Sequence, residues 1–430
     1  MRVRALFPVL MLALGSIPAA AQVAFNVAPS GETTPFPGAS LKGGDTAVWL
    51  HPTDRSKSLV LGVDGQSALY LYALDGSSAG SYPGAFSQVD VRYGFPLGTL
   101  QPALVALLGT EGSLTFATVD PTTRAVTNVS GSGVNVGAQP GCARIFHVRG
   151  SAAYELVTTN GTEVKRWALG SSNGKVTATP IATYPGVLSG PATACASDEA
   201  LSRMYVVDGV QGLSVLDFLG DGGLSATLVA QANVSAELGS PTAVAVYPGG
   251  GQGGYLAVAS NAPLGGGRTV INFFERQSLS IVADFQVTAP GVSVESTRGL
   301  AFSGLVISDA YSPGLLVVHD GTNSSNFKLV SLGNVSNAAD GGRSSDGGVR
   351  LGSLEPAFDP RDEGAVSVGP DAGERDGGGP DTQGTFPPGA NGKEGGKIDY
   401  GGCGCSHAPS VASLGLISLL TLAFVLRRRP

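Results

Sequence analysis

The chain has 430 residues, of which 42% are hydrophobic, and its formal net charge is −7, from 26 basic and 33 acidic residues. The body of the chain has no basic cluster, so the charge pattern argues against nucleic acid as a partner. A phosphorylated ligand would need cations to bridge it to so acidic a protein.

The first residues have the pattern of a secretory signal. Arg2 and Arg4 give a charged start, an apolar run covers residues 5–14, and three small residues end at Ala21. The run is too short to serve as an ordinary membrane-spanning helix. We therefore predict a signal peptide at residues 1–21 and export of the rest of the chain.

The body of the chain, residues 22–333, reads as short strands separated by turns. The strands are rich in Val, Leu, Tyr and Phe, and Gly, Asp, Asn and Pro bound them. Typical predicted strands are 59–62, 69–74, 103–108, 114–119, 204–207, 213–218, 255–259 and 315–318. A weak repeat of about 45–50 residues fits about six four-stranded units, as in a β-propeller. We predict an all-β fold; a two-sheet sandwich is the alternative.

The composition changes after the body. Residues 334–402 alternate charge with glycine and nearly lack aromatic side chains. Such a stretch cannot bury enough apolar surface to offset its chain entropy, which predicts a disordered linker that acts as a stalk.

The last segment, residues 403–430, combines Cys403 and Cys405 with an apolar run at 411–426 and three final arginines. As a helix the run spans about 24 Å, which is marginal for a bilayer. We predict one C-terminal transmembrane helix at 411–426, with the arginines in the cytoplasm and the body outside.

This order of parts resembles the myxobacterial-type C-terminal sorting tail, which has a Gly-Cys motif, a transmembrane helix and an Arg cluster. The resemblance implies cleavage by a sorting protease near the cysteines and a lipidated Cys403 or Cys405. The body would then stay on the cell surface or outer membrane, or be released. An uncleaved C-terminal anchor is the alternative, and it also places the body outside the cell.

The stretch from Asp45 to Phe95 is the most informative part of the body. It contains Asp45-Thr-Ala-Val-Trp-Leu-His-Pro-Thr-Asp54 and Val89-Asp-Val-Arg-Tyr-Gly-Phe95. These residues resemble the opening blade of the β-propeller phytases, secreted calcium-dependent phosphatases of inositol phosphates. The resemblance implies a six-bladed β-propeller with phosphohydrolase activity on inositol phosphates or related phosphomonoesters.

The family's site is a cluster of calcium ions held by carboxylates that converge on one mouth of the propeller. By resemblance, the calcium ligands in this chain are Asp45, Asp54, Asp208 and Asp320. Arg92 or Arg298 would grip the phosphate, because a guanidinium matches phosphate oxygens. Other roles remain open: Asp54 is also a plain turn former, and Asp320 could make a turn at the seam of the ring.

Several positions depart from the family pattern. Thr193 and Thr242 stand where the family has carboxylates, and Arg298 stands at a calcium-ligand position, unless the alignment slips toward Glu295. A cation in place of an anion opposes the binding of calcium there. The alternative function is therefore a propeller that has lost catalysis and presents its mouth as a surface binding module for a ligand, a polysaccharide or a protein.

The body contains two cysteines, Cys142 and Cys195. Many of the phytases also carry cysteine at these places, so the resemblance implies a disulfide bond, which export permits. Otherwise both would be small buried apolar residues. Neither has Cys-x-x-Cys spacing, which argues against zinc.

Overall fold

The computed structural model describes residues 25–36, 43–131, 133–148, 151–208, 210, 212–218, 224–228, 240–249, 253–261, 268–289, 292–322, 325–341, 359 and 361. The chain divides into two units, Met1–Val368 and Gly369–Pro430, and every described residue belongs to the first. The signal peptide predicted at 1–21, nearly all of the linker, the cysteines Cys403 and Cys405 and the helix predicted at 411–426 lie outside these residues. Among the described residues, no helix has the length and apolar character needed to cross a membrane.

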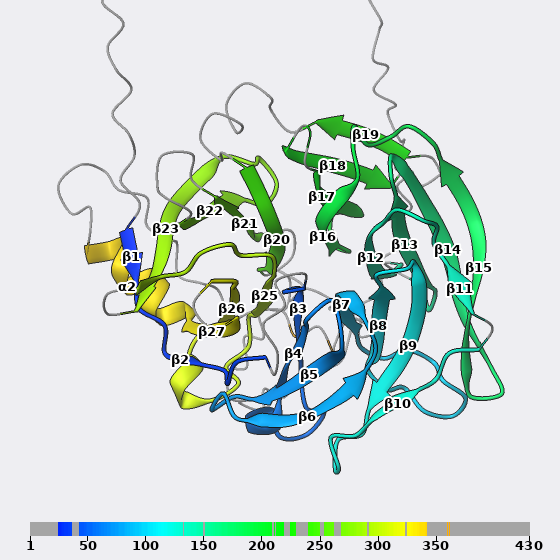
Figure 1. Ribbon diagram of the computed structural model, residues 1–430, viewed down its shortest axis with the longest axis horizontal. Coiled ribbons are helices and arrows are strands. Elements are labelled where there is room, and N and C mark those ends of the chain that lie inside the picture. The colour runs from blue at the N-terminus through cyan, green and yellow to red at the C-terminus, as the bar shows by residue number, and fades with distance from the viewer. Residues whose placement is uncertain are drawn as a thin grey trace, which may run out of the picture. The chain divides into compact units, whose positions relative to one another are not determined.

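Six antiparallel sheets form the blades of a propeller (Figure 1). Blade 1 contains β3 (Thr46–Trp49), β4 (Leu59–Val63), β5 (Ala68–Ala73) and β6 (Ser78–Pro83). Blade 2 contains β7 (Phe86–Arg92), β8 (Leu104–Gly109), β9 (Ser113–Val119), β10 (Val126–Asn128) and β11 (Val134–Asn135). Blade 3 contains β12 (Pro140–His147), β13 (Tyr154–Asn160), β14 (Glu163–Ser172) and β15 (Lys175–Tyr184).

The second half of the ring repeats the pattern. Blade 4 contains β16 (Ala192–Asp198), β17 (Arg203–Asp208), β18 (Gly212–Phe218) and β19 (Leu224–Leu228). Blade 5 contains β20 (Ser240–Pro248), β21 (Gly254–Asn261), β22 (Thr269–Glu275), β23 (Ile281–Ala289) and β24 (Val292–Ser293). Blade 6 contains β25 (Leu300–Ser303), β26 (Leu315–Asp320) and β27 (Asn326–Ser331). The predicted all-β, six-bladed propeller is confirmed, and the sandwich is wrong.

The core lies between the blades, because each blade buries both of its faces. In blade 1, Val48 and Val60 pack toward blade 6, whereas Trp49 and Leu61 pack toward blade 2. This alternation follows from the period of two along a strand. Apolar clusters of this kind fill each of the six interfaces between neighbouring blades, including the one between blades 6 and 1. The ring is therefore closed by packing.

The N-terminal residues complete the last blade. The short strand β2 (Gly31–Glu32) pairs antiparallel with β27 and supplies the fourth strand of blade 6. Just before it, β1 (Phe25–Val27) pairs in parallel with β23 on the edge of blade 5. Strands from the two ends of the propeller thus lie side by side (Figure 1).

Three short helices complete the described elements: η1 (Arg55–Lys57), η2 (Asp309–Tyr311) and α2 (Leu332–Gly341). Leu332 and Val335 lie one turn apart on α2 and are fully buried against blades 5 and 6. This helix crosses position 334, at which the sequence predicts the linker to begin. Further on, Arg361 Nη1 donates to the carbonyls of His51 and Pro52, at distances of 2.9 and 3.2 Å, so the chain contacts blade 1 again.

Candidate functional site

The innermost strands of the six blades begin at one end of the ring and finish at the other. Gly44 lies against Gly299 just before β3 and β25 begin, and Gln88 near the start of β7 bonds the Thr193 carbonyl near the start of β16. We call this end the N-side. At the other end, here the C-side, Arg92 at the end of β7 reaches Glu199 just after β16.

Three of the four predicted calcium ligands lie on the N-side. Asp45 directly precedes β3, whereas Asp208 and Asp320 end β17 and β26, the strands that run antiparallel to the innermost ones. All three side chains are buried. Asp54 differs, because it follows β3 in the loop on the C-side.

The carboxylate of Asp45 is fully engaged by protein groups. Its Oδ2 atom accepts a hydrogen bond from Val89 N–H at 2.8 Å. Arg144 Nη2 lies 3.3 Å from Oδ1 and 3.2 Å from Oδ2. Burial raises the pKa of the Asp45 carboxyl, while the positive charge of Arg144 and the Val89 bond oppose that shift.

The other two N-side aspartates also have protein partners. Asp320 lies 3.7 Å from Lys328 Nζ, and its Oδ1 accepts the Glu295 and Thr322 N–H groups at 3.4 and 3.3 Å. Asp208 accepts the Val210 N–H at 2.9 Å. The Val210 and Thr322 N–H groups each lie two residues after the aspartate that accepts their bond, which is typical of aspartate in a turn where a strand ends.

Asp54 has the local role that its place in a turn suggests. Its carboxylate caps the short helix η1 by accepting the Ser56 N–H, and it forms an ion pair with Lys57 at 3.1 Å. The Ser56 hydroxyl and Lys57 hold the pKa of this carboxyl below its usual value. With 41% of its side chain exposed, Asp54 lies at the surface of the protein.

The two predicted phosphate-binding arginines differ in how far they are exposed to solvent. The Arg92 side chain is 19% exposed and bonds Glu199 at 2.5 Å, Asp90 at 3.4 Å and the Ser197 hydroxyl. Its charge is therefore matched by two carboxylates within the wall of the ring. Arg298 is exposed on the N-side, directly before Gly299 and β25. Of the two, Arg298 is the guanidinium that solvent and ligands can reach.

Arg298 also influences His319, which is buried beside it. The His319 ring packs against Phe327, with 5.7 Å between ring centroids, and against Phe36 at 6.3 Å. Burial and the charge of Arg298 together lower the pKa of His319 to about 4. At neutral pH this imidazole is uncharged and adds no positive charge to the N-side.

Cys142 and Cys195 form a disulfide bond between β12 and β16, with an S–S distance of 2.18 Å. Both cysteines are fully buried between blades 3 and 4. The bond joins two neighbouring innermost strands.

The described residues do not fit a multi-calcium centre. Calcium takes six to eight oxygen ligands, usually several of them carboxylates. Asp45 is occupied by Arg144 and Val89, and Asp54 lies on the C-side. Across the described ranges, no three or more His, Cys, Asp or Glu side chains are grouped so as to hold a metal ion.

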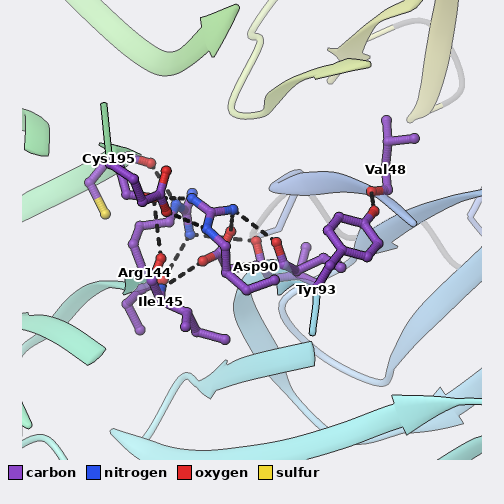
Figure 2. A network of polar contacts seen from close by, with 12 residues as sticks. Val48, Asp90, Tyr93, Arg144, Ile145 and Cys195 are labelled. Carbon is purple, nitrogen blue, oxygen red and sulfur yellow. Dashed lines mark hydrogen bonds and ion pairs between the residues drawn. The ribbon is translucent and has the colours of Figure 1, made fainter. Parts of the chain in front are cut away.

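No motif in the sequence predicts the role of Arg144, which lies in the middle of β12. Figure 2 shows its guanidinium near Cys195, at the centre of a polar network that also includes Asp90 bonded to Ile145. The sequence does contain one signal, a single charged residue within an otherwise apolar strand. Because buried charges in proteins are paired, such a residue predicts a buried partner of opposite charge.

The chain resembles known proteins along most of its length. The phytase family model matches residues 3–350. The 3-phytase of Bacillus subtilis (strain 168) is 25% identical over 335 residues, which cover 71% of this chain and 84% of that protein. The solved structures of BBS1N in complex with ARL6DN match less well. The mercury-soaked form has a TM-score of 0.39 and 12% identity, over 64% of this chain and 75% of that one. The lead-soaked form has a TM-score of 0.38 and 14% identity, with the same coverage.

Both of these structural matches have low TM-scores. The match to the family model is different, because it covers the whole propeller with its closing strands and extends past helix α2. The chain belongs to the phytase family.

Proposed function

We propose that this protein is a phytase-like phosphohydrolase that releases phosphate from inositol phosphates or related phosphomonoesters outside the cell. The observation that carries the proposal is the family match over residues 3–350, together with the similarity to a 3-phytase over 84% of that protein's length. The signal-like residues 1–21 support export, and the tail at 403–430 supports display at the cell surface.

Within this proposal the substrate binds on the N-side, where Arg298 is exposed. A guanidinium donates two parallel hydrogen bonds to phosphate oxygens and keeps its charge at any physiological pH. An acidic protein needs such a group to draw in a polyanion. Arg298 would orient the phosphate.

The test is phosphate release from phytate and from p-nitrophenyl phosphate by the full chain, with and without a chelator. Arg298→Met should lower kcat/KM by roughly 10- to 100-fold, the value of a hydrogen bond to a charged group. Arg124→Met is the matched control, because Arg124 lies in the turn between β9 and β10 on the C-side. Equal losses in the two variants would rule out this role for Arg298.

The second candidate is a propeller that has lost catalysis and binds a surface ligand. The ion pair between Asp45 and Arg144 favours this second function. By resemblance to the family, Asp45 would bind calcium, but here its carboxylate is bound to Arg144 instead. If the chain binds inositol hexakisphosphate but releases no phosphate from either substrate, the binding module is correct. If it neither binds nor turns over, the phosphohydrolase proposal fails.

A further inference from the structure

Most of the buried aspartates in the described ranges have a cation of the protein beside them. Six aspartates in the described ranges are buried: Asp45, Asp64, Asp90, Asp198, Asp208 and Asp320. Four of these lie 3.2 to 3.7 Å from an arginine or lysine, in the pairs Asp45–Arg144, Asp90–Arg92, Asp198–Arg276 and Asp320–Lys328. Burying a carboxylate is costly unless it is paired, so these cations supply charge that the buried carboxylates require.

Arg144 is held in place from three innermost strands. Its Nε donates to the Cys195 carbonyl on β16 at 2.7 Å, and its Nη1 donates to the Ala143 carbonyl on β12 at 3.0 Å. Nη1 also lies 3.5 Å from the Val89 carbonyl on β7. With these bonds fixing two nitrogens, Nη2 points at Asp45 (Figure 2 shows the guanidinium from close by). Cys195, whose carbonyl accepts the bond from Arg144 Nε, is also joined to Cys142 on β12 by the disulfide bond.

From the side of Asp45, both oxygens are used. Oδ1 bonds Arg144, and Oδ2 bonds Arg144 and the Val89 amide. A calcium ion bound here would lie within a few ångströms of the guanidinium and be repelled by it. With the Arg144 side chain 8% exposed and its donors bonded to backbone carbonyls, no rotation that clears the site is available without breaking those bonds.

We propose that Arg144 is the built-in counter-ion of Asp45: its guanidinium takes the position beside this carboxylate that a calcium ion would need. Asp45 is then a structural residue that links blades 1, 2 and 3, and the ring assembles there without calcium. The inference concerns the counter-ion alone and holds whether or not the chain hydrolyses phosphate.

The first experiment is a calorimetric calcium titration of the full chain, as wild type and as Asp45→Asn. The asparagine keeps an acceptor for the Val89 amide and removes the charge. Our expectation is that the two proteins bind the same number of calcium ions with the same affinity. The loss of a site in Asp45→Asn, or a roughly tenfold weaker Kd, would overturn the proposal.

The second experiment measures thermal unfolding in a chelator. Arg144→Met should lower Tm, because it leaves Asp45 buried and unpaired, and the double variant Asp45→Asn/Arg144→Met should melt above the single one. Arg166→Met is the matched control, since Arg166 pairs with Glu155 at 2.8 Å within blade 3 and outside the network around Asp45. A double variant no more stable than Arg144→Met would contradict the pairing. If Arg144→Met fails to fold, the calcium titration of Asp45→Asn alone tests whether Asp45 is a calcium ligand.

Discussion

Arg276 Nε lies 3.3 Å from Asp198 Oδ2, and each of the two side chains is only 1% exposed. Asp198 ends β16 in blade 4 and Arg276 follows β22 in blade 5, so the pair ties neighbouring blades together near the C-side. Burial raises the pKa of the Asp198 carboxyl, and the positive charge of Arg276 counters that effect. The two charges are tolerated inside the protein because they are buried together.

Removing one partner of this pair should therefore destabilise the folded protein strongly. We expect Arg276→Met to lower the free energy of unfolding by about 3–5 kcal/mol, since it leaves Asp198 as a buried unpaired charge. Lys57→Met should cost under about 1 kcal/mol, because Lys57 and its partner Asp54 are 56% and 41% exposed. Urea unfolding of the two variants measures the difference, and equal costs would show that burial does not govern it.

The depressed pKa of His319 predicts a loss of stability in acid. Between about pH 6.5 and pH 4 the unfolded chain binds a proton at this residue that the folded protein does not. The free energy of unfolding should therefore fall as pH is lowered through this window, by up to about 3 kcal/mol, and this contribution should level off below pH 4. Unfolding at several pH values, for wild type and His319→Gln, checks this. If the free energy of unfolding of His319→Gln falls with pH as steeply as that of wild type, the acid sensitivity comes from other groups.

The interface between blades 1 and 6 should be sensitive to added volume. Gly62 on β4 faces the ring of the fully buried Phe327 so closely that a Cβ atom would overlap it. Gly62→Ala should cost about 1–3 kcal/mol by overpacking. Gly80→Ala is a useful comparison in the same blade because its Cβ would meet open space, although its backbone φ of 150° also disfavours alanine. A Tm for Gly62→Ala equal to that of wild type would mean that Phe327 moves aside at no cost.

The disulfide bond should matter more than a single packing contact. It closes a loop with a sequence separation of 53 residues, for which the chain-entropy account gives about 4 kcal/mol. We expect the Cys142→Ala/Cys195→Ala variant to unfold at a much lower urea concentration than wild type. Under reducing conditions the wild type should approach the variant. Identical midpoints for the oxidised wild type and the variant would refute a stabilising role.

Much of the fold could be predicted from local sequence. The strand predicted at 213–218 is β18 (Gly212–Phe218), and that at 114–119 is β9 (Ser113–Val119), because aliphatic runs between glycine and aspartate turns determine strands locally. The short N-terminal strands could not be foreseen: β2 has only two residues, and its partner β27 follows almost 300 residues later.

The candidate site was harder to predict than the fold. Asp45 and Asp54 are close in sequence, but β3 lies between them, and at about 3.3 Å per residue a strand carries the chain from one side of the ring to the other. The pairing of Asp45 with Arg144 depends on contacts between blades 1 and 3, to which no local pattern points. Sequence motifs identified the family, whereas the partners of each charge required the three-dimensional arrangement.

The pairing of β2 with β27 also governs when the ring can be completed. Glu32 and Lys328, which bond across this pair, are 296 residues apart in the sequence. A strand synthesised near the start of the propeller must wait for the strand that is synthesised last, so the contact order is high and the final step of folding is expected to be slow. Until then β27 is an open edge to which another chain can add. A chain that stops before residue 326 never forms the pair, and intermolecular strand exchange is the failure to which this topology is exposed.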